Sequence, residues 1–196
     1  VFSQVMAHYP GHVIEVVSII EKAGAGYDLG VELLKVAAMA PAQAVKWAED
    51  RQDAGHRFKP EYRHWVDLFK RLGADPKLQA VQRSAGGHYM ATAKRYMASY
   101  GFRSERALCL LFDIAVQMGS IKAASAGRYN AWGVEHKAAC EEQKLEALAR
   151  AVGPQGGRWE RDVLSRKLTI AIGSGIVHGR SYQLERDFGV TMAPAA

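Results

Sequence analysis

The chain has 196 residues, of which 48% are hydrophobic and 23% charged, with a formal net charge of +6 and a pI near 9.4. This composition excludes a disordered or low-complexity chain, and no apolar run approaches the roughly 20 residues that a membrane-spanning helix needs. We therefore expect one soluble domain over residues 1–196. The basic excess favours an anionic partner, but the basic residues are spread among acidic ones. That pattern is typical of a solvated surface and disfavours a nucleic-acid binder.

Metal and cofactor sites are not expected. The seven histidines are dispersed, and a Pro-Gly pair separates His8 from His12, which have helical i, i+4 spacing. Cys109 and Cys140 have no metal-ligand spacing and cannot form a disulfide framework. The sequence contains no phosphate-binding loop, nucleophile elbow or HExxH motif. We therefore predict no cofactor and no metal.

Helical periodicity dominates the first half of the chain. The apolar stripes cover Phe2–Tyr9, Val13–Ile20, Leu29–Ala37 and Tyr62–Phe69, with a further helix from Pro41 and a turn over Gly55–Pro60. Asp75, as N-cap, starts a long helix that ends before Gly101. Gly86 and Gly87 lie inside it, and their cost in a helix indicates a kink or the close approach of another helix.

The second half predicts the centre of an all-α fold. Ser104–Ser120 is the most apolar segment, and we expect it to form a central buried helix with Ser104 as its cap. A long polar helix is predicted from about Ala131 to Ala151, followed by a loop at Gly153–Gly157 and a helix over Trp159–Ile172. The irregular, Gly-rich tail from Gly173 to Ala196 has room for a small C-terminal hairpin.

Asp113 is the exception within the apolar central helix, because a buried aspartate needs a partner or a cleft. Gln117 follows one turn later and Ser120 three residues after that, so the three side chains form a polar stripe. Two interpretations remain open. Asp113 makes a structural ion pair, for example with an arginine, or the stripe lines a substrate groove.

The tail contains a second candidate binding segment. Its glycines let the backbone turn tightly or approach a ligand, while His178, Arg180 and Tyr182 supply hydrogen-bond donors and a ring that suit a sugar. A plain C-terminal hairpin explains the same pattern.

Several of these segments resemble the chitosanase-like branch of the lysozyme superfamily. Leu72–Gln82 (LGADPKLQAVQ), Gly101–Ala107 (GFRSERA) and Leu111–Ser120 (LFDIAVQMGS) are similar to the middle of such hydrolases. There a D-P-x-[FL]-Q-x-x-Q helix leads to a buried helix with a [YF]-D-x-x-V pattern. The segment Arg166–Gly189, with its G-x-G-x-V-H-G-x-x-Y run, resembles the end of bacterial and phage cell-wall hydrolases of the same superfamily.

The resemblance implies a two-lobed, lysozyme-like helical fold with a sugar-binding groove. It also implies hydrolysis by two carboxylates, a Glu near the end of the first helix and an Asp on a following Gly-rich segment. Phe2–Pro10 looks like the element after that segment, so we expect both carboxylates upstream of Val1 and leave the catalytic residues of this chain unknown. Glu21 and Asp28 imitate the pattern faintly and are expected on the surface.

The leading hypothesis is therefore a glycoside hydrolase of an amino-sugar polymer, peptidoglycan or chitosan, in a periplasmic, secreted or phage-encoded lytic context. The alternative is a non-catalytic helical module that binds the cell wall or a partner. Neither a nucleic-acid partner nor a membrane span is expected, and the sequence predicts no oligomeric state.

Overall fold

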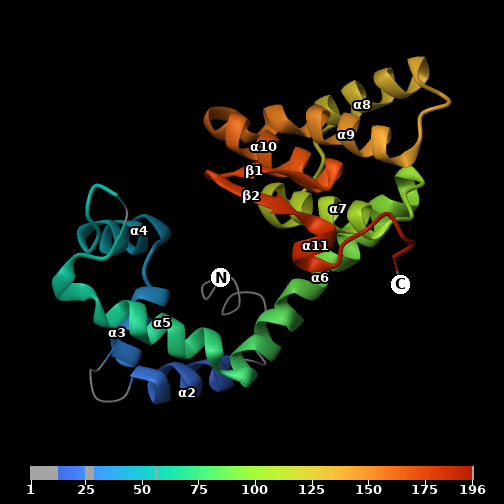
Figure 1. Cartoon of the computed structure of the whole chain (residues 1–196). Helices are drawn as coiled ribbons and strands as arrows, with labels where there is room; N and C mark the ends of the chain where they lie inside the picture. Colours follow the sequence, from blue (N-terminus) through green and yellow to red (C-terminus); the bar gives the residue numbers. More distant parts are fainter. Residues whose placement is uncertain (1–12, 25–28, 56, 196) are drawn as a thin grey trace. The chain divides into compact units, whose positions relative to one another are not determined.

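The computed structural model describes residues 13–24, 29–55 and 57–195, most of which are helical (Figure 1). Contacts divide the chain into two compact units, unit 1 (Val1–Gly87) and unit 2 (His88–Ala196). The prediction of a mostly helical fold with room for a small C-terminal hairpin is confirmed for the described residues. A lysozyme-like topology and a domain over 1–196 stay predictions. None of the described helices combines the length and apolarity that crossing a bilayer requires. The predicted Phe2–Tyr9 helix lies outside the described residues.

Unit 1 is a small set of helices packed around a buried tryptophan. Its elements are α2 (Val13–Gly24), α3 (Leu29–Ala37), α4 (Pro41–Asp50), η2 (Pro60–Tyr62), α5 (His64–Ala74) and the first part of α6 (Pro76–Tyr100). Trp65 is 1% exposed and packs with Ile20, Leu33 and Leu68, while Trp47 meets its ring edge-on at 4.9 Å. The periodic apolar residues of these segments thus form one core.

The long helix α6 begins as predicted but is uninterrupted. Asp75 Oδ1 accepts hydrogen bonds from the backbone N–H groups of Lys77 (2.8 Å) and Leu78 (3.2 Å), which caps the helix. The helix continues through Gly86 and Gly87, and a Cβ added at either glycine would meet no described atom within 4 Å outside its own stretch of helix. Among the described residues, none therefore makes the close approach that is one of the two expectations for these glycines. The division between the two units falls directly after Gly87.

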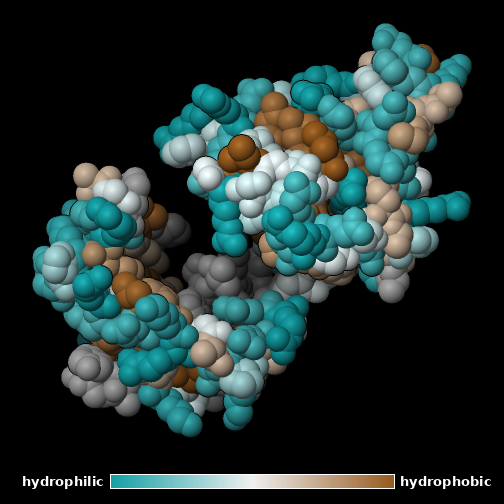
Figure 2. Space-filling view, in the orientation of Figure 1, coloured by the Kyte–Doolittle hydropathy of each residue, from teal (hydrophilic) through white to brown (hydrophobic). Residues whose placement is uncertain are grey.

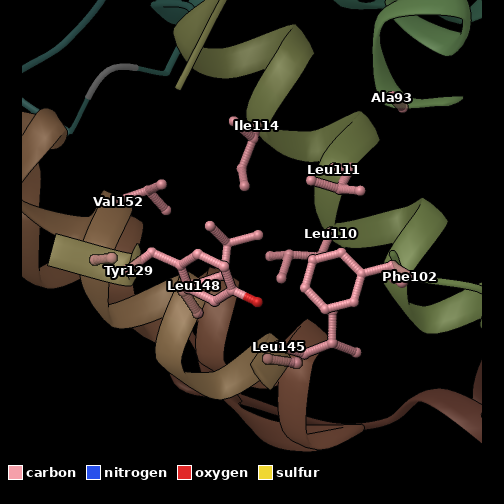
Figure 3. Packing of buried hydrophobic residues seen from close by; sticks show 13 residues of the cluster. Ala93, Phe102, Leu110, Leu111, Ile114, Tyr129, Leu145, Leu148 and Val152 are labelled. Carbon is pink, nitrogen blue, oxygen red and sulfur yellow. The ribbon is translucent and has the colours of Figure 1, made fainter. Parts of the chain in front are cut away.

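Unit 2 contains the central helix and the hairpin. Its elements after α6 are α7 (Glu105–Met118), α8 (Ala123–Glu135), α9 (Glu141–Val152), η3 (Gly153–Trp159), α10 (Glu160–Ile172), β1 (Ser174–Val177), β2 (Arg180–Gln183) and α11 (Leu184–Phe188). The core shown in Figure 3 joins α7, α8 and α9, where Leu110, Leu111, Leu145 and Leu148 are each 0% exposed. One face of α7 is the buried centre of the unit, as predicted, whereas Val116 on another face is 49% exposed.

The predicted helix from Ala131 to Ala151 is wrong, because two helices meet there with a break at 136–140. Helix α8 ends where the ring of His136 stacks on Trp132, with centroids 4.5 Å apart. Helix α9 then starts at a capping box, in which the Gln143 side chain accepts from the Cys140 backbone N–H at 3.0 Å. These local contacts end one helix and start the next.

The expected C-terminal hairpin is present. Strands β1 and β2 pair antiparallel, and the two residues between them, His178 (φ 50°) and Gly179 (φ 77°), both have positive φ. A two-residue turn of this kind matches the right-handed twist of the flanking strands. Figure 2 shows a largely hydrophilic surface over unit 2 with hydrophobic atoms gathered near α10 and β1, the elements that carry the exposed Ile172 and Ile176.

Glu141 connects the start of α9 to the start of α7. Its carboxylate accepts backbone hydrogen bonds from Arg103 (3.1 and 3.2 Å) and from Ser104 (2.8 Å), whose own hydroxyl caps α7 as predicted. Partial burial acts to raise the pKa of Glu141, but the hydrogen bonds from Ser104 and Arg103 outweigh it and hold the pKa below its ordinary value of 4.5.

Because the pKa of Glu141 is lowered, the free energy of unfolding should depend on pH in the acid range. The stabilisation by Glu141 is present above the unfolded pKa and is lost as the pH falls through the folded value. We expect Glu141→Gln to lower the free energy of unfolding by about 1–2 kcal/mol at neutral pH and to flatten its decline below about pH 5. Urea unfolding measured across the acid range checks this, with the exposed neighbour Glu142→Gln as control. Equal acid profiles for both variants would contradict the assignment.

Candidate functional site

A buried ion pair joins the central helix α7 to α10. Lys167 Nζ donates to Asp113 Oδ2 over 2.7 Å and to Gln117 Oε1 over 2.8 Å. Arg166 Nη2 lies 3.0 Å from Asp113 Oδ1. The Lys167 side chain is 0% exposed and that of Asp113 is 20% exposed, so burial lowers the pKa of Lys167 while the Asp113 carboxylate opposes this. Asp113 thus makes the structural ion pair that one of the two interpretations predicted, with a lysine as its buried partner.

The rest of the predicted polar stripe lies at the end of α7. Gln117 is exposed, and the bond from Lys167 to its Oε1 fixes the orientation of its amide. Ser120 takes part through its backbone carbonyl, which accepts from Gln155 Nε2 at 3.0 Å. The Gln155 Oε1 in turn accepts from the backbone N–H of Lys122 at 2.9 Å. Both glutamines are therefore held in place beside the end of α7.

An exposed tryptophan lies close by, where η3 meets α10. Gly157, with φ 55°, departs from helical geometry and kinks η3 just before this point. Trp159 follows with 61% of its surface exposed, and the Arg158 guanidinium carbon lies 5.2 Å from the centroid of its ring. The sharp turn thus presents a large aromatic ring to solvent at the start of a helix.

Trp159 lines two pockets. The larger, about 400 Å³, is lined by Gln117, Met118, Lys122, Gln155, Gly156, Trp159, Asp162 and Val163. The second, about 320 Å³, is lined by Arg158, Trp159, Arg161, Asp162, Ser165 and His178. Because both include Trp159 and Asp162, we call the two together the Trp159 groove. It combines an apolar ring with amide, carboxylate and cationic groups, a mixture typical of small-molecule sites.

His178 reaches the Trp159 groove from the turn of the hairpin. Its Nε2 lies 3.3 Å from Asp162 Oδ1, on the first turn of α10. Ser165 Oγ donates to the backbone carbonyl of Ile176 over 2.7 Å, which ties β1 to the same helix. Of the three candidate residues in the tail, His178 therefore lines a pocket of unit 2.

Arg180 and Tyr182 are placed differently from His178. They lie two residues apart on β2 and so share one face of the hairpin, with the Arg180 guanidinium carbon 5.2 Å from the centroid of the Tyr182 ring. Tyr182 also stacks with Phe188 of α11, centroids 6.3 Å apart. Neither residue lines the Trp159 groove. Of the six predicted site residues, Gln117 and His178 are the two that the structure brings into this groove.

Sequence reasoning missed the centre of the groove. The sequence pattern places Trp159 on a helix and does not distinguish Gln155, Arg158, Arg161 or Asp162 from other surface residues. One signal was available, because an aromatic residue directly after two glycines and an arginine stands at a turn rather than on a buried helix face.

Comparisons with protein families, curated proteins and solved structures found no match to this chain. Among the residues that the structure describes, no cluster of three His, Cys, Asp or Glu side chains is placed to hold a metal ion. Glu21 is exposed on α2, and Asp28 lies outside the described residues. Asp162 is the one carboxylate among the described residues that line the Trp159 groove.

Proposed function

We propose that this chain binds an amino-sugar polymer, peptidoglycan or chitosan, in the Trp159 groove, as the glycan-binding part of a cell-wall glycoside hydrolase. The single observation that carries the proposal is that Trp159, 61% exposed, lines two pockets. An indole offers a broad, rigid apolar face together with a polar N–H, so it can stack on a sugar ring at little entropic cost.

The polar groups around the ring suit hydroxyl and acetamido groups. Gln117 and Gln155 are oriented by the bonds to their amides, and Asp162 supplies acceptor oxygens. Preoriented groups of this kind lose less freedom when a ligand binds. Leu111–Ser120 resembles chitosanase-like hydrolases and Arg166–Gly189 resembles cell-wall hydrolases, and both resemblances imply the same class of ligand.

The groove favours binding over cleavage. Glycoside hydrolysis uses two carboxylates, one as acid and one as base or nucleophile, and the described lining residues contribute one, Asp162. We therefore expect the purified chain to bind the glycan without hydrolysing it. Release of reducing sugar that stops in Asp162→Asn would assign the cleavage to this groove and overturn this part of the proposal.

Titration of the chain with a tetramer of N-acetylglucosamine, followed by calorimetry, tests the binding. Trp159→Ala should weaken the affinity by about tenfold or more, because the loss of one aromatic stacking face is worth about 1.4 kcal/mol or more. Phe188→Ala is the matched control, since Phe188 is also 61% exposed and lines neither pocket.

The same titration separates the two candidate surfaces of unit 2. We expect Tyr182→Ala to bind like the wild type, because Tyr182 lies with Arg180 and Phe188 on the hairpin and α11. A loss of binding in Tyr182→Ala together with full binding in Trp159→Ala would move the site to the hairpin and refute the groove.

A further inference from the structure

The positive charge of the chain is concentrated in the unit that contains the Trp159 groove. Unit 1 has 11 Lys and Arg against 10 Asp and Glu, a net charge of +1. Unit 2 has 15 against 10, a net charge of +5. Almost the whole excess of +6 therefore belongs to unit 2, and any anionic ligand is attracted there first.

The two arginines of the groove lack a carboxylate partner among the described residues, unlike three other arginines of unit 2. Arg150 pairs with Glu146 at 2.7 Å, Arg166 with Asp113 at 3.0 Å, and Arg186 with Asp187 at 2.8 Å. Arg158 and Arg161 form no ion pair with any residue in the described part of the chain.

The one carboxylate among the described lining residues of the groove, Asp162, faces His178. Asp162 lines both pockets, but its Oδ1 faces His178 Nε2 at 3.3 Å. Lys122 adds a further cation to the larger pocket. Apart from His178, the charged side chains of the groove are three cations and one carboxylate, a sum of +2. Both uncompensated guanidinium groups lie in the second pocket, beside the ring of Trp159.

We infer that the Trp159 groove selects a glycan whose sugars carry carboxylates, with Arg158 and Arg161 as the groups that recognise the acid. This inference rests on the proposed function, because it assumes that Trp159 stacks on the sugar. A guanidinium binds a carboxylate through two parallel charge-assisted hydrogen bonds, whereas the protonated amines of chitosan meet like charge here. The favoured ligand is therefore peptidoglycan, whose muramic acid units carry a lactyl carboxyl group that is ionised wherever no peptide is attached to it.

Salt should distinguish the two contributions to affinity, stacking on Trp159 and the attraction of the arginines for a carboxylate. Stacking on Trp159 depends little on ionic strength, while attraction of exposed arginines for a carboxylate is screened as the Debye length falls from about 10 Å at 0.1 M to about 3 Å at 1 M. The preference for an acidic sugar should therefore shrink at high salt, and the binding of an uncharged sugar should remain.

Three tetrasaccharides of equal length test the inference on the full chain by calorimetry. They are a neutral N-acetylglucosamine tetramer, an acidic tetramer that alternates N-acetylglucosamine with N-acetylmuramic acid, and a cationic glucosamine tetramer under mildly acidic conditions. We expect the acidic tetramer to bind about tenfold or more tightly than the neutral one, and the cationic one to bind weakest. The double variant Arg158→Gln with Arg161→Gln should lose the preference and bind the acidic and neutral tetramers with similar affinity.

The control is Arg150→Gln, an exposed arginine of the same unit that already pairs with Glu146. Equal affinity of the wild type for the acidic and neutral tetramers, or an equal loss of preference in Arg150→Gln, overturns the inference while the proposed glycan binding stands. No binding of the neutral tetramer, or the same binding in Trp159→Ala, overturns the proposed function itself. A single-stranded dT oligonucleotide that binds more tightly than the acidic tetramer at equal salt overturns the inference in favour of a nucleic-acid site.

Discussion

Asp113→Ala should lower the free energy of unfolding of unit 2 by about 3–5 kcal/mol, because it leaves a buried ammonium without its counter-charge. Lys167 is 0% exposed, and its Nζ would keep one hydrogen bond, to Gln117 Oε1. Hydrogen exchange resolved to the peptides of α7 and α10 measures this loss within unit 2. Wild-type protection in Asp113→Ala would contradict the buried ion pair.

The change of this stability loss with pH provides a second test. Burial already holds the pKa of Lys167 below its ordinary value of 10.5, and loss of Asp113 lowers that pKa further. A base with a folded pKa below its unfolded pKa costs stability at low pH, and the cost is relieved as the pH rises between the two values. The deficit of Asp113→Ala should therefore shrink as the pH increases above neutrality. A deficit that grows towards alkaline pH would show that Lys167 is not the group left uncompensated.

A matched pair of variants separates the charge from the packing. Lys167→Met removes the buried ammonium, and Asp113 then remains 20% exposed and paired with Arg166, so its cost should be smaller than that of Asp113→Ala. Adding Lys167→Met to Asp113→Ala should restore part of the stability. If the losses of unfolding free energy in the two single variants simply add in the double variant, Asp113 and Lys167 are not coupled and the buried ion pair is contradicted.

The parts of the fold that the sequence predicted correctly depend on short-range signals. Asp75 and Ser104 cap their helices through the next three residues, and the periodic apolar stripes identify the faces that meet in each core. The break between α8 and α9 was missed because every residue from 131 to 151 is compatible with a helix. What ends α8 is the stacking of His136 on Trp132 and the capping of α9 at Cys140, and neither alters the hydrophobic pattern.

The candidate site was harder to predict because its partners are distant in the chain. The need of Asp113 for a partner follows from its apolar neighbours, but the partner, Lys167, lies 54 residues away within a segment that also offers Arg166. The exposure of Trp159 depends on the φ of Gly157, which allows the chain to turn before α10. The basic composition favours an anionic partner. Only the division into two units shows that most of the net positive charge belongs to unit 2, which contains the Trp159 groove.

The second large effect concerns the contact that holds the hairpin against α10. A Cβ added at Gly175 would overlap Thr169 Oγ1, with the Thr169 Cβ at 3.1 Å and Cα at 3.3 Å behind it, so the neighbour cannot give way by rotation alone. We expect Gly175→Ala to lower the free energy of unfolding of unit 2 by about 1–3 kcal/mol through this overpacking. Peptide-resolved hydrogen exchange over β1 and α10 measures the loss.

Gly133→Ala is the matched control for that change. Nothing lies within 4 Å of a Cβ at Gly133, which sits inside α8, so the same added methyl should raise stability by up to about 1 kcal/mol. Thr169→Ala removes the overlapping hydroxyl and should recover part of the loss when it is combined with Gly175→Ala. The hairpin also carries His178 to Asp162, so Gly175→Ala should weaken binding of the N-acetylglucosamine tetramer as well. If Gly175→Ala and Gly133→Ala have the same stability and the same affinity, the hairpin is not held by this close approach.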